Sequence, residues 1–142
     1  SVPRSTAGSS KGTDGSPPRI PGGTSPPGPW WRPNRGEAVN RGEIWWVEAP
    51  EVGRRPACIL TRQAAIPVLR SVLVAPATRR IRRIPTEVLL GPDDGMPEEC
   101  ALSLDNVTVV PKAFLVEKIT TLQPHRLEEV CRALAIATGC AP

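Results

Sequence analysis

The most regular hydrophobic pattern in this sequence lies close to its C-terminal end. Apolar side chains recur there at spacings of three and four residues, which aligns them on one face of a helix: Leu127, Val130, Cys131 and Leu134. Pro124 suits the first position of such a helix, and Gly139 suits the residue just past its end. The pattern predicts one amphipathic helix between these two residues, with its apolar face against a core.

Upstream of this helix, apolar and β-branched residues occur in short runs bounded by Pro and Gly, a pattern typical of strands. Residues 43–48 and 56–61 form the first two runs, and residues 50–55 indicate a turn between them. Pro56 is expected at the start of its strand, because proline cannot donate to a sheet ladder. Further strands are predicted within residues 68–78, 85–90 and 100–110. Five or six short strands followed by one helix predict a mostly β (α+β) fold, a small and strongly bent β-barrel with a helix packed on it.

The first 40 residues differ in composition from the rest of the 142-residue chain. They contain 8 Pro, 7 Gly and 6 Ser and few aliphatic side chains, so they bury too little apolar surface to offset the entropy of ordering the chain. We therefore predict a disordered segment at 1–40 and one folded domain at 41–142. The sequence shows no secretory signal and no apolar run of roughly 20 residues that would span a membrane, which predicts a cytoplasmic protein.

Charge is nearly balanced within the predicted domain. Residues 1–40 hold five of the 18 basic and two of the 14 acidic residues, which leaves 13 basic and 12 acidic residues for the rest. The only dense basic run lies in a loop between predicted strands: Arg79, Arg80, Arg82 and Arg83. Such a run is either a surface for an anionic ligand or an ordinary solvated loop, and the sequence by itself leaves both open.

The chemistry-bearing side chains narrow the possible mechanisms. Four scattered cysteines without a Cys-x-x-Cys pair, together with the single His125, do not make a zinc site. The acidic turn at residues 93–99 lacks the second carboxylate cluster of a two-metal site. We predict neither a metal nor a cofactor. A nuclease that relies on two histidines is excluded as well, so composition and spacing leave the chemistry open.

Two motifs resemble the opening of MazF/PemK toxins. Arg41-Gly42-Glu43-Ile44-Trp45 matches R-G-[DE]-[VI]-[WY], and Gly53-Arg54-Arg55-Pro56-Ala57-Cys58-Ile59-Leu60 is similar to G-x-R-P-x-[LV]-[VI]-[LI]. Later segments resemble the remaining family landmarks in the same order: residues 74–78, 85–88, 103–107 and 118–122. The resemblance implies an SH3-like barrel with a C-terminal helix, a homodimer, metal-independent and sequence-selective cleavage of single-stranded RNA, and inhibition by a cognate MazE-like antitoxin.

The resemblance also implies site residues. Arg55 takes the place of the family's catalytic arginine, and Thr78 takes that of the threonine at the end of the third strand. A guanidinium can contact two phosphate oxygens at once, and a hydroxyl can hydrogen-bond the scissile group. The alternative for Arg55 is an arginine in a surface turn, and for Thr78 a hydroxyl that satisfies a strand end. The candidate RNA-binding residues are Glu51, Arg54, Arg79, Arg80, Arg82 and Arg83.

The chain departs from the family pattern in two places. Its loop between the first two strands is short and keeps only Glu51 as a counterpart of the family's Ser-Glu-Gln, so the general acid and base stay unassigned. Asp105-Asn106 replaces the family's Glu/Asp-Gln pair, and we interpret it as structural. Trp45 and Trp46 point to opposite faces of their strand. We expect Trp46 in the core, with the other ring free to stack on a base or to join a dimer interface.

Two alternatives to RNA cleavage remain at this point. One is a toxin of the same fold that poisons DNA gyrase, a class with a Trp-Gly pair near its C-terminus, where this chain has Thr138-Gly139-Cys140-Ala141-Pro142. The other is an RNA-binding module without catalysis, which would keep the arginine loop but would not need Arg55 beside Thr78. The RNA recognition sequence and the class of target RNA do not follow from the sequence.

Overall fold

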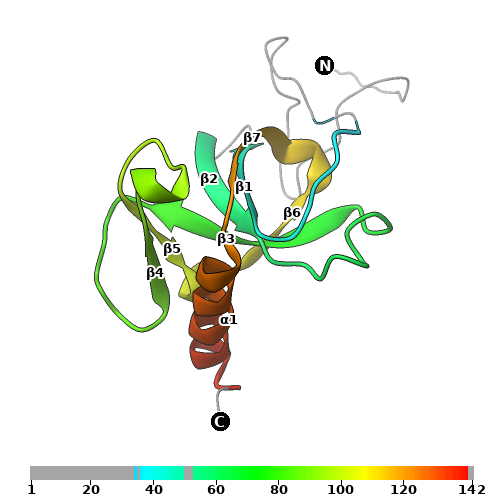
Figure 1. The fold of residues 1–142 in the computed structure, drawn as a ribbon. Helices are drawn as coiled ribbons and strands as arrows, with labels where there is room; N and C mark the ends of the chain where they lie inside the picture. Colours follow the sequence, from blue (N-terminus) through cyan, green and yellow to red (C-terminus); the bar gives the residue numbers. More distant parts are fainter. Residues whose placement is uncertain (1–33, 35, 50–52, 141–142) are drawn as a thin grey trace, which may run out of the picture. The chain divides into compact units, whose positions relative to one another are not determined.

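The computed structural model of the chain describes residues 34, 36–49 and 53–140 (Figure 1). The strands in this part are β1 (Glu43–Ala49), β2 (Gly53–Ile59), β3 (Ser71–Thr78), β4 (Glu87–Leu90), β5 (Cys100–Ser103), β6 (Thr108–Pro111) and β7 (Leu115–Thr121). Three short 3-10 turns, η1 (Pro92–Asp94), η2 (Leu104–Asn106) and η3 (Lys112–Phe114), lie between them, and the helix α1 (Pro124–Thr138) follows β7.

The strands pair antiparallel in the order β4-β5-β3-β2-β1-β7. Strand β3 crosses the middle of the fold, because its first half also pairs with β6 and its last two residues pair with β5. The predicted mostly β fold with one C-terminal helix is confirmed. Among the described strands the path stays open, so the sheet bends strongly without closing into a complete barrel.

Helix α1 begins and ends where the sequence predicts. Pro124 occupies its first turn, and Gly139 closes it with a left-handed φ of 75°, donating its N–H to the carbonyls of Ala135 and Ile136. Val130 is fully buried, and the helix packs against β4 and η2 beneath the sheet (Figure 1). The helix therefore closes one face of the sheet.

One member of the predicted apolar stripe does not face the core. Cys131 is exposed, and its sulfur accepts a hydrogen bond from Arg41 at 3.2 Å. Ala133 takes the second fully buried position of the helix instead. Leu127 and Leu134 are partly buried against the core, so the buried face of the helix is centred on Val130 and Ala133. Cys58, in β2, is buried as expected.

Strand boundaries differ from the prediction around β2. The strand begins at Gly53, so Arg54 and Arg55 lie in a strand opposite Glu48 and Val47 rather than in a turn. Pro56 is inside this strand and not at its start. It is tolerated there because β2 pairs with β3 only from the next residue onward, which leaves one edge of β2 without a ladder at that point.

Other boundaries also shift. The region predicted as one strand at 100–110 is split by η2, and the strand predicted from residue 68 begins only at Ser71. Strand β7 was not among the predicted strands, although residues 118–122 resemble a family landmark; it covers the outer edge of β1. The pairing of β7 with β1 contains two register shifts. These shifts interrupt the alternation of apolar and polar side chains by which a strand is recognised in a sequence.

Residues before β1 also pack on the sheet. Val39 is buried, and Asn40 donates hydrogen bonds from its backbone and side chain to the Glu43 carboxylate. Of the segment at 1–40, predicted to be disordered, residues 1–33 and 35 lie outside the described residues. In the ranges that the structure does describe, no helix has the length and apolarity to cross a membrane.

Candidate active site

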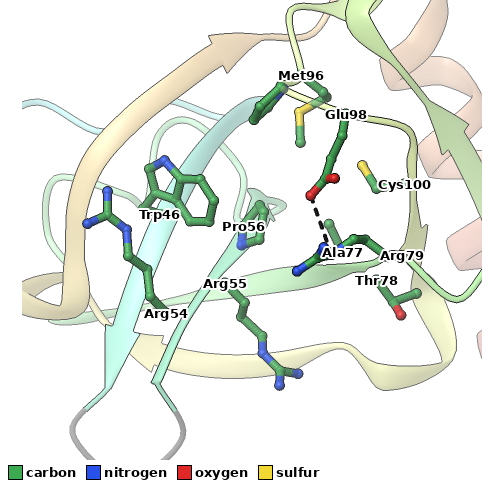
Figure 2. A pocket seen from close by; sticks show the side chains of 11 residues that line it. Trp46, Arg54, Arg55, Pro56, Ala77, Thr78, Arg79, Met96, Glu98 and Cys100 are labelled. Atoms are coloured by element: carbon green, nitrogen blue, oxygen red, sulfur yellow. Dashed lines mark ion pairs between the residues drawn. The ribbon is translucent and has the colours of Figure 1, made fainter.

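The candidate site lies at the end of the sheet where β2 begins and β3 ends. Ala57 in β2 pairs with Pro76 in β3. Arg55 lies two residues before Ala57 and Thr78 two residues after Pro76, so both lie just beyond the paired part of the two strands, at the same end of the sheet. Both residues line one groove with a volume of about 280 Å³ (Figure 2). The structure therefore brings together the two side chains that the resemblance singled out.

Arg55 stands apart from the neighbouring arginine in its contacts. Arg54 is held by Glu117 at 2.9 Å, and its guanidinium lies 4.8 Å from the centre of the Trp46 ring. Arg55 is exposed and has no hydrogen-bond or ion-pair partner among the described residues. Figure 2 shows its guanidinium reaching away from the Trp46 ring. Arg54 therefore helps to hold a wall of the groove, while the charge of Arg55 is available to a ligand.

Thr78 is the last residue of β3 and is half-buried. Its hydroxyl oxygen accepts a hydrogen bond from the Arg80 N–H at 3.1 Å, which turns the chain out of the strand. The strand-end role considered for this residue is therefore real. The hydroxyl hydrogen is still available as a donor to a groove ligand, because a hydroxyl both donates and accepts.

The loop arginines do not act as one patch. Arg79 lines the groove and forms an ion pair with Glu98 at 3.3 Å. The backbone N–H groups of Arg82 and Arg83 both donate to the Glu87 carboxylate, and the Arg82 side chain lies 3.5 Å from it. Within the described part of the chain, Arg79 and Arg54 line the groove, whereas Arg80, Arg82 and Arg83 do not. Glu51 lies outside the described residues.

The prediction that Trp46 belongs to the core is wrong. Trp45 is the buried ring, with 2% of its surface exposed, and its indole N–H donates to Glu43 at 2.9 Å. Trp46 is half-buried and lines the groove beside Pro56, its cross-strand neighbour. Alternation along β1 places the two rings on opposite faces, but the identity of the inner face depends on what packs over each side of the sheet.

The remaining wall is formed by Met96, Pro97 and Glu98 from the turn between β4 and β5, and by Cys100, the first residue of β5. Sequence reasoning did not assign these residues to the site, since no local pattern shows that this turn folds over β2. Burial, and after it the nearby Glu98 and Asp94 carboxylates, raises the pKa of the Cys100 thiol, so the thiol stays protonated and is a poor nucleophile.

Contacts with α1 and β7 hold this turn in place. The Arg126 guanidinium donates two hydrogen bonds to the Asp94 carboxylate, at 2.9 and 3.2 Å, and the Thr120 hydroxyl donates to the Asp94 carbonyl. Gly95 has a φ of 90°, and a Cβ at this position would collide with the Thr120 side chain. The wall that carries Glu98 is therefore anchored from two elements.

Three other residues considered in the sequence analysis do not line the groove: Asp105, Asn106 and His125. Asn106 donates to the Ser103 hydroxyl at 2.7 Å, and Asp105 accepts from the Thr86 hydroxyl, which supports the structural interpretation of this pair. His125 is exposed in the first turn of α1 and does not line the groove. Among the described residues, no three His, Cys, Asp or Glu side chains are grouped to hold a metal ion.

Comparison with known families identifies the chain. Residues 40–138 match the PemK-like, MazF-like toxins of type II toxin–antitoxin systems. The chain belongs to this family. Among MazF relatives, a probable endoribonuclease MazF5 of Mycobacterium tuberculosis is 46% identical over 102 residues, which cover 71% of this chain and 94% of the relative. A probable endoribonuclease MazF2 of the same species is 34% identical over 103 residues, covering 72% of this chain and all of the relative.

Solved MazF structures share the fold. A mycobacterial endoribonuclease in complex with its cognate antitoxin is 26% identical and aligns with a TM-score of 0.68, covering 74% of this chain and 99% of that one. The Mycobacterium tuberculosis toxin MazF-mt6 is 28% identical with a TM-score of 0.65, covering 70% and 99%.

Proposed function

We propose that this MazF-family protein is a toxin endoribonuclease that cleaves single-stranded RNA in the groove at Arg55 and Thr78. One observation carries the assignment of the site. Arg55 is an exposed guanidinium without a partner among the described residues, and it shares a groove with the Thr78 hydroxyl. The neighbouring Arg54 is engaged with Glu117, which leaves the charge of Arg55 for a ligand of the groove. The relatives named as MazF endoribonucleases support the activity.

The chemistry that suits these residues is transfer of the phosphoryl group within the RNA. The ribose 2′-oxygen forms a bond to phosphorus while the bond to the 5′-oxygen breaks, which leaves a 2′,3′-cyclic phosphate and a free 5′-hydroxyl. Arg55 neutralises the charge that grows on the non-bridging oxygens, and Thr78 donates a hydrogen bond to the same group. A general base takes the 2′-hydroxyl proton and a general acid supplies one to the leaving oxygen.

Further parts of the proposal concern partners and location. An antitoxin with an acidic segment would compete with RNA for Arg55, because carboxylates and phosphates both accept hydrogen bonds from a guanidinium. The mycobacterial relative solved with its cognate antitoxin supports such a partner. We also propose a homodimer, a cytoplasmic site of action, and contacts to RNA from Glu51 and from the loop arginines Arg80, Arg82 and Arg83.

A cleavage assay with an arginine control tests the activity. The protein is incubated with total RNA, and new 5′ ends are mapped. Arg55→Ala should lower the cleavage rate at least about 100-fold, which is the scale for losing one donor aimed at transition-state charge. Arg62→Ala removes another exposed arginine that does not line the groove, and should cleave like the wild type.

The outcomes separate the candidate functions. Wild-type rates from Arg55→Ala would show that the site is assigned to the wrong residue. An absence of cleavage by the wild type, with inhibition of DNA gyrase in a supercoiling assay, would favour the gyrase-poisoning alternative. RNA binding without cleavage would favour the non-catalytic module.

A further inference from the structure

The groove has a second part that the cleavage chemistry does not use. Alternation along β2 places Arg54 and Pro56 on the face opposite Arg55. Trp46, Pro56 and Met96 give this part an apolar lining, and Glu98 supplies a carboxylate. Figure 2 shows the Trp46 ring and the Glu98 carboxylate on two sides of the groove, with Pro56 between them.

An apolar wall facing one carboxylate is a poor place for a phosphate. The carboxylate repels the RNA backbone, and the two guanidinium groups in this part of the groove are already engaged, Arg54 with Glu117 and Arg79 with Glu98. A nucleobase suits the space better, because its ring can pack on the Trp46 side while its polar edge faces Glu98. The positive charge needed for the backbone is supplied by Arg55 on the other side of β2.

We propose that Trp46, Pro56 and Glu98 form a base subsite that selects guanine, a proposal that rests on the proposed RNA cleavage. Guanine is the one RNA base whose Watson–Crick edge presents two adjacent donors, the ring N1–H and the exocyclic amine, which two carboxylate oxygens can accept together. Uracil places its single N–H between two carbonyls. Cytosine and adenine place a ring nitrogen with a lone pair beside their amine. Each of these repels a carboxylate.

The contacts of Glu98 fit this role. Its Oε2 atom lies 3.3 Å from Arg79 Nε, and the side chain is 57% exposed. Oε1 has no hydrogen-bond partner among the described residues. Arg79 itself is 80% exposed, so this surface ion pair orients the carboxylate weakly and a base can compete for it. Glu98 is thus a specificity residue rather than part of the cleavage machinery.

A matched pair of glutamates provides the test. Glu98→Gln keeps the size of the side chain but replaces one acceptor with a donor. Glu99→Gln makes the same change at the adjacent exposed residue, which does not line the groove. Each protein is given a pool of randomised single-stranded RNA, and the cut sites are sequenced. A 2′-deoxy version of the pool, which lacks the attacking hydroxyl, is used in parallel to select bound sequences.

The wild type and Glu99→Gln should favour guanine at one position, and Glu98→Gln should lose that preference about tenfold, the scale of discrimination by one bidentate contact to a base. Melting temperatures should be equal for all three proteins. An unchanged base profile in Glu98→Gln, or no guanine preference in the wild type, would overturn the subsite. If the RNA pool is not cut but the deoxy pool shows a Glu98-dependent guanine preference, the cleavage proposal fails and the subsite stands.

Discussion

Thr78 illustrates, at the scale of a residue, how one side chain can serve the fold and a ligand together. Its oxygen is occupied by the Arg80 N–H, while its hydrogen is available to the groove. Substitution by serine keeps both functions, and substitution by valine removes both without changing the volume much. Measuring the cleavage rate and the thermal stability of both variants shows which of the two roles depends on the hydroxyl.

We predict that Thr78→Ser retains most of the cleavage rate, whereas Thr78→Val lowers it about 10- to 100-fold, as expected for losing one donor to the scissile group. The melting temperature of the valine variant should fall little, because the Arg80 N–H is exposed and can bond to water. Single-turnover kinetics and thermal unfolding provide the two measurements. Equal rates for the serine and valine variants would restrict Thr78 to its strand-end role.

At the scale of elements, an arginine of α1 connects the helix to the turn that forms one wall of the groove. Arg126 binds Asp94 in the turn that carries the Glu98 wall, and it also contacts Glu129 within the helix. Burial alone would raise the pKa of Asp94, but hydrogen bonds from Arg126 and the Gly91 N–H outweigh it and hold the pKa below its ordinary value of 3.8. The ionised carboxylate thus stabilises the folded state.

Because the pKa of Asp94 is lowered in the folded state, the free energy of unfolding depends on pH. A carboxylate with a lowered folded-state pKa contributes stability that is fully present above about pH 4 and is lost as the pH falls through the folded value. Arg126→Gln should therefore lower the free energy of unfolding by about 1–2 kcal/mol at pH 7, and the difference from the wild type should shrink below pH 4.

Denaturant unfolding between pH 3 and pH 7 measures this difference. Arg132→Gln, an exposed change on the same helix, controls for the loss of one positive charge. A wild-type to Arg126→Gln difference that stayed constant across this range would mean that the Asp94 pair contributes nothing that depends on ionisation.

At the scale of the whole molecule, the stability of the fold depends on residues just before β1, which contact the buried Glu43. Glu43 is a buried carboxylate whose acceptors are filled by Asn40 and Trp45, with Lys118 3.5 Å away. Burial raises its pKa, but these hydrogen bonds and the Lys118 charge give a net pKa below the ordinary value of 4.5. Asn40 therefore completes the shell of a buried charge, and Val39 adds apolar burial.

Two truncations should behave differently. Deleting residues 1–33 should leave the melting temperature and the RNA cleavage rate unchanged, as their Pro/Gly/Ser content predicts. Deleting residues 1–40 should cost about 2–4 kcal/mol, because Val39 leaves the core and Glu43 loses two donors. Denaturant midpoints and cleavage rates of both truncated proteins give the comparison. Lost activity in the shorter deletion would assign a function to residues 1–33.

The sequence by itself determined the local features of this protein. Helix α1 follows from the spacing of its apolar residues and from Pro124 and Gly139, all of which act within a few residues of one another. The family follows from two motifs around Arg41 and Arg55, since those motifs are contiguous. The choice of Arg55 and Thr78 was inferred from resemblance, and the groove that both side chains line gives it a structural basis.

Only the tertiary structure decided which side chains share the groove. Alternation shows that Trp45 and Trp46 face opposite ways, but the tertiary packing over each side of β1 decides that Trp45 is buried and that Trp46 faces the groove beside the turn at residues 92–98. Glu98 enters the site through that turn, and Glu87 holds Arg82 and Arg83 away from it. These contacts join residues distant in sequence, so they depend on strand order and register, which local patterns do not encode.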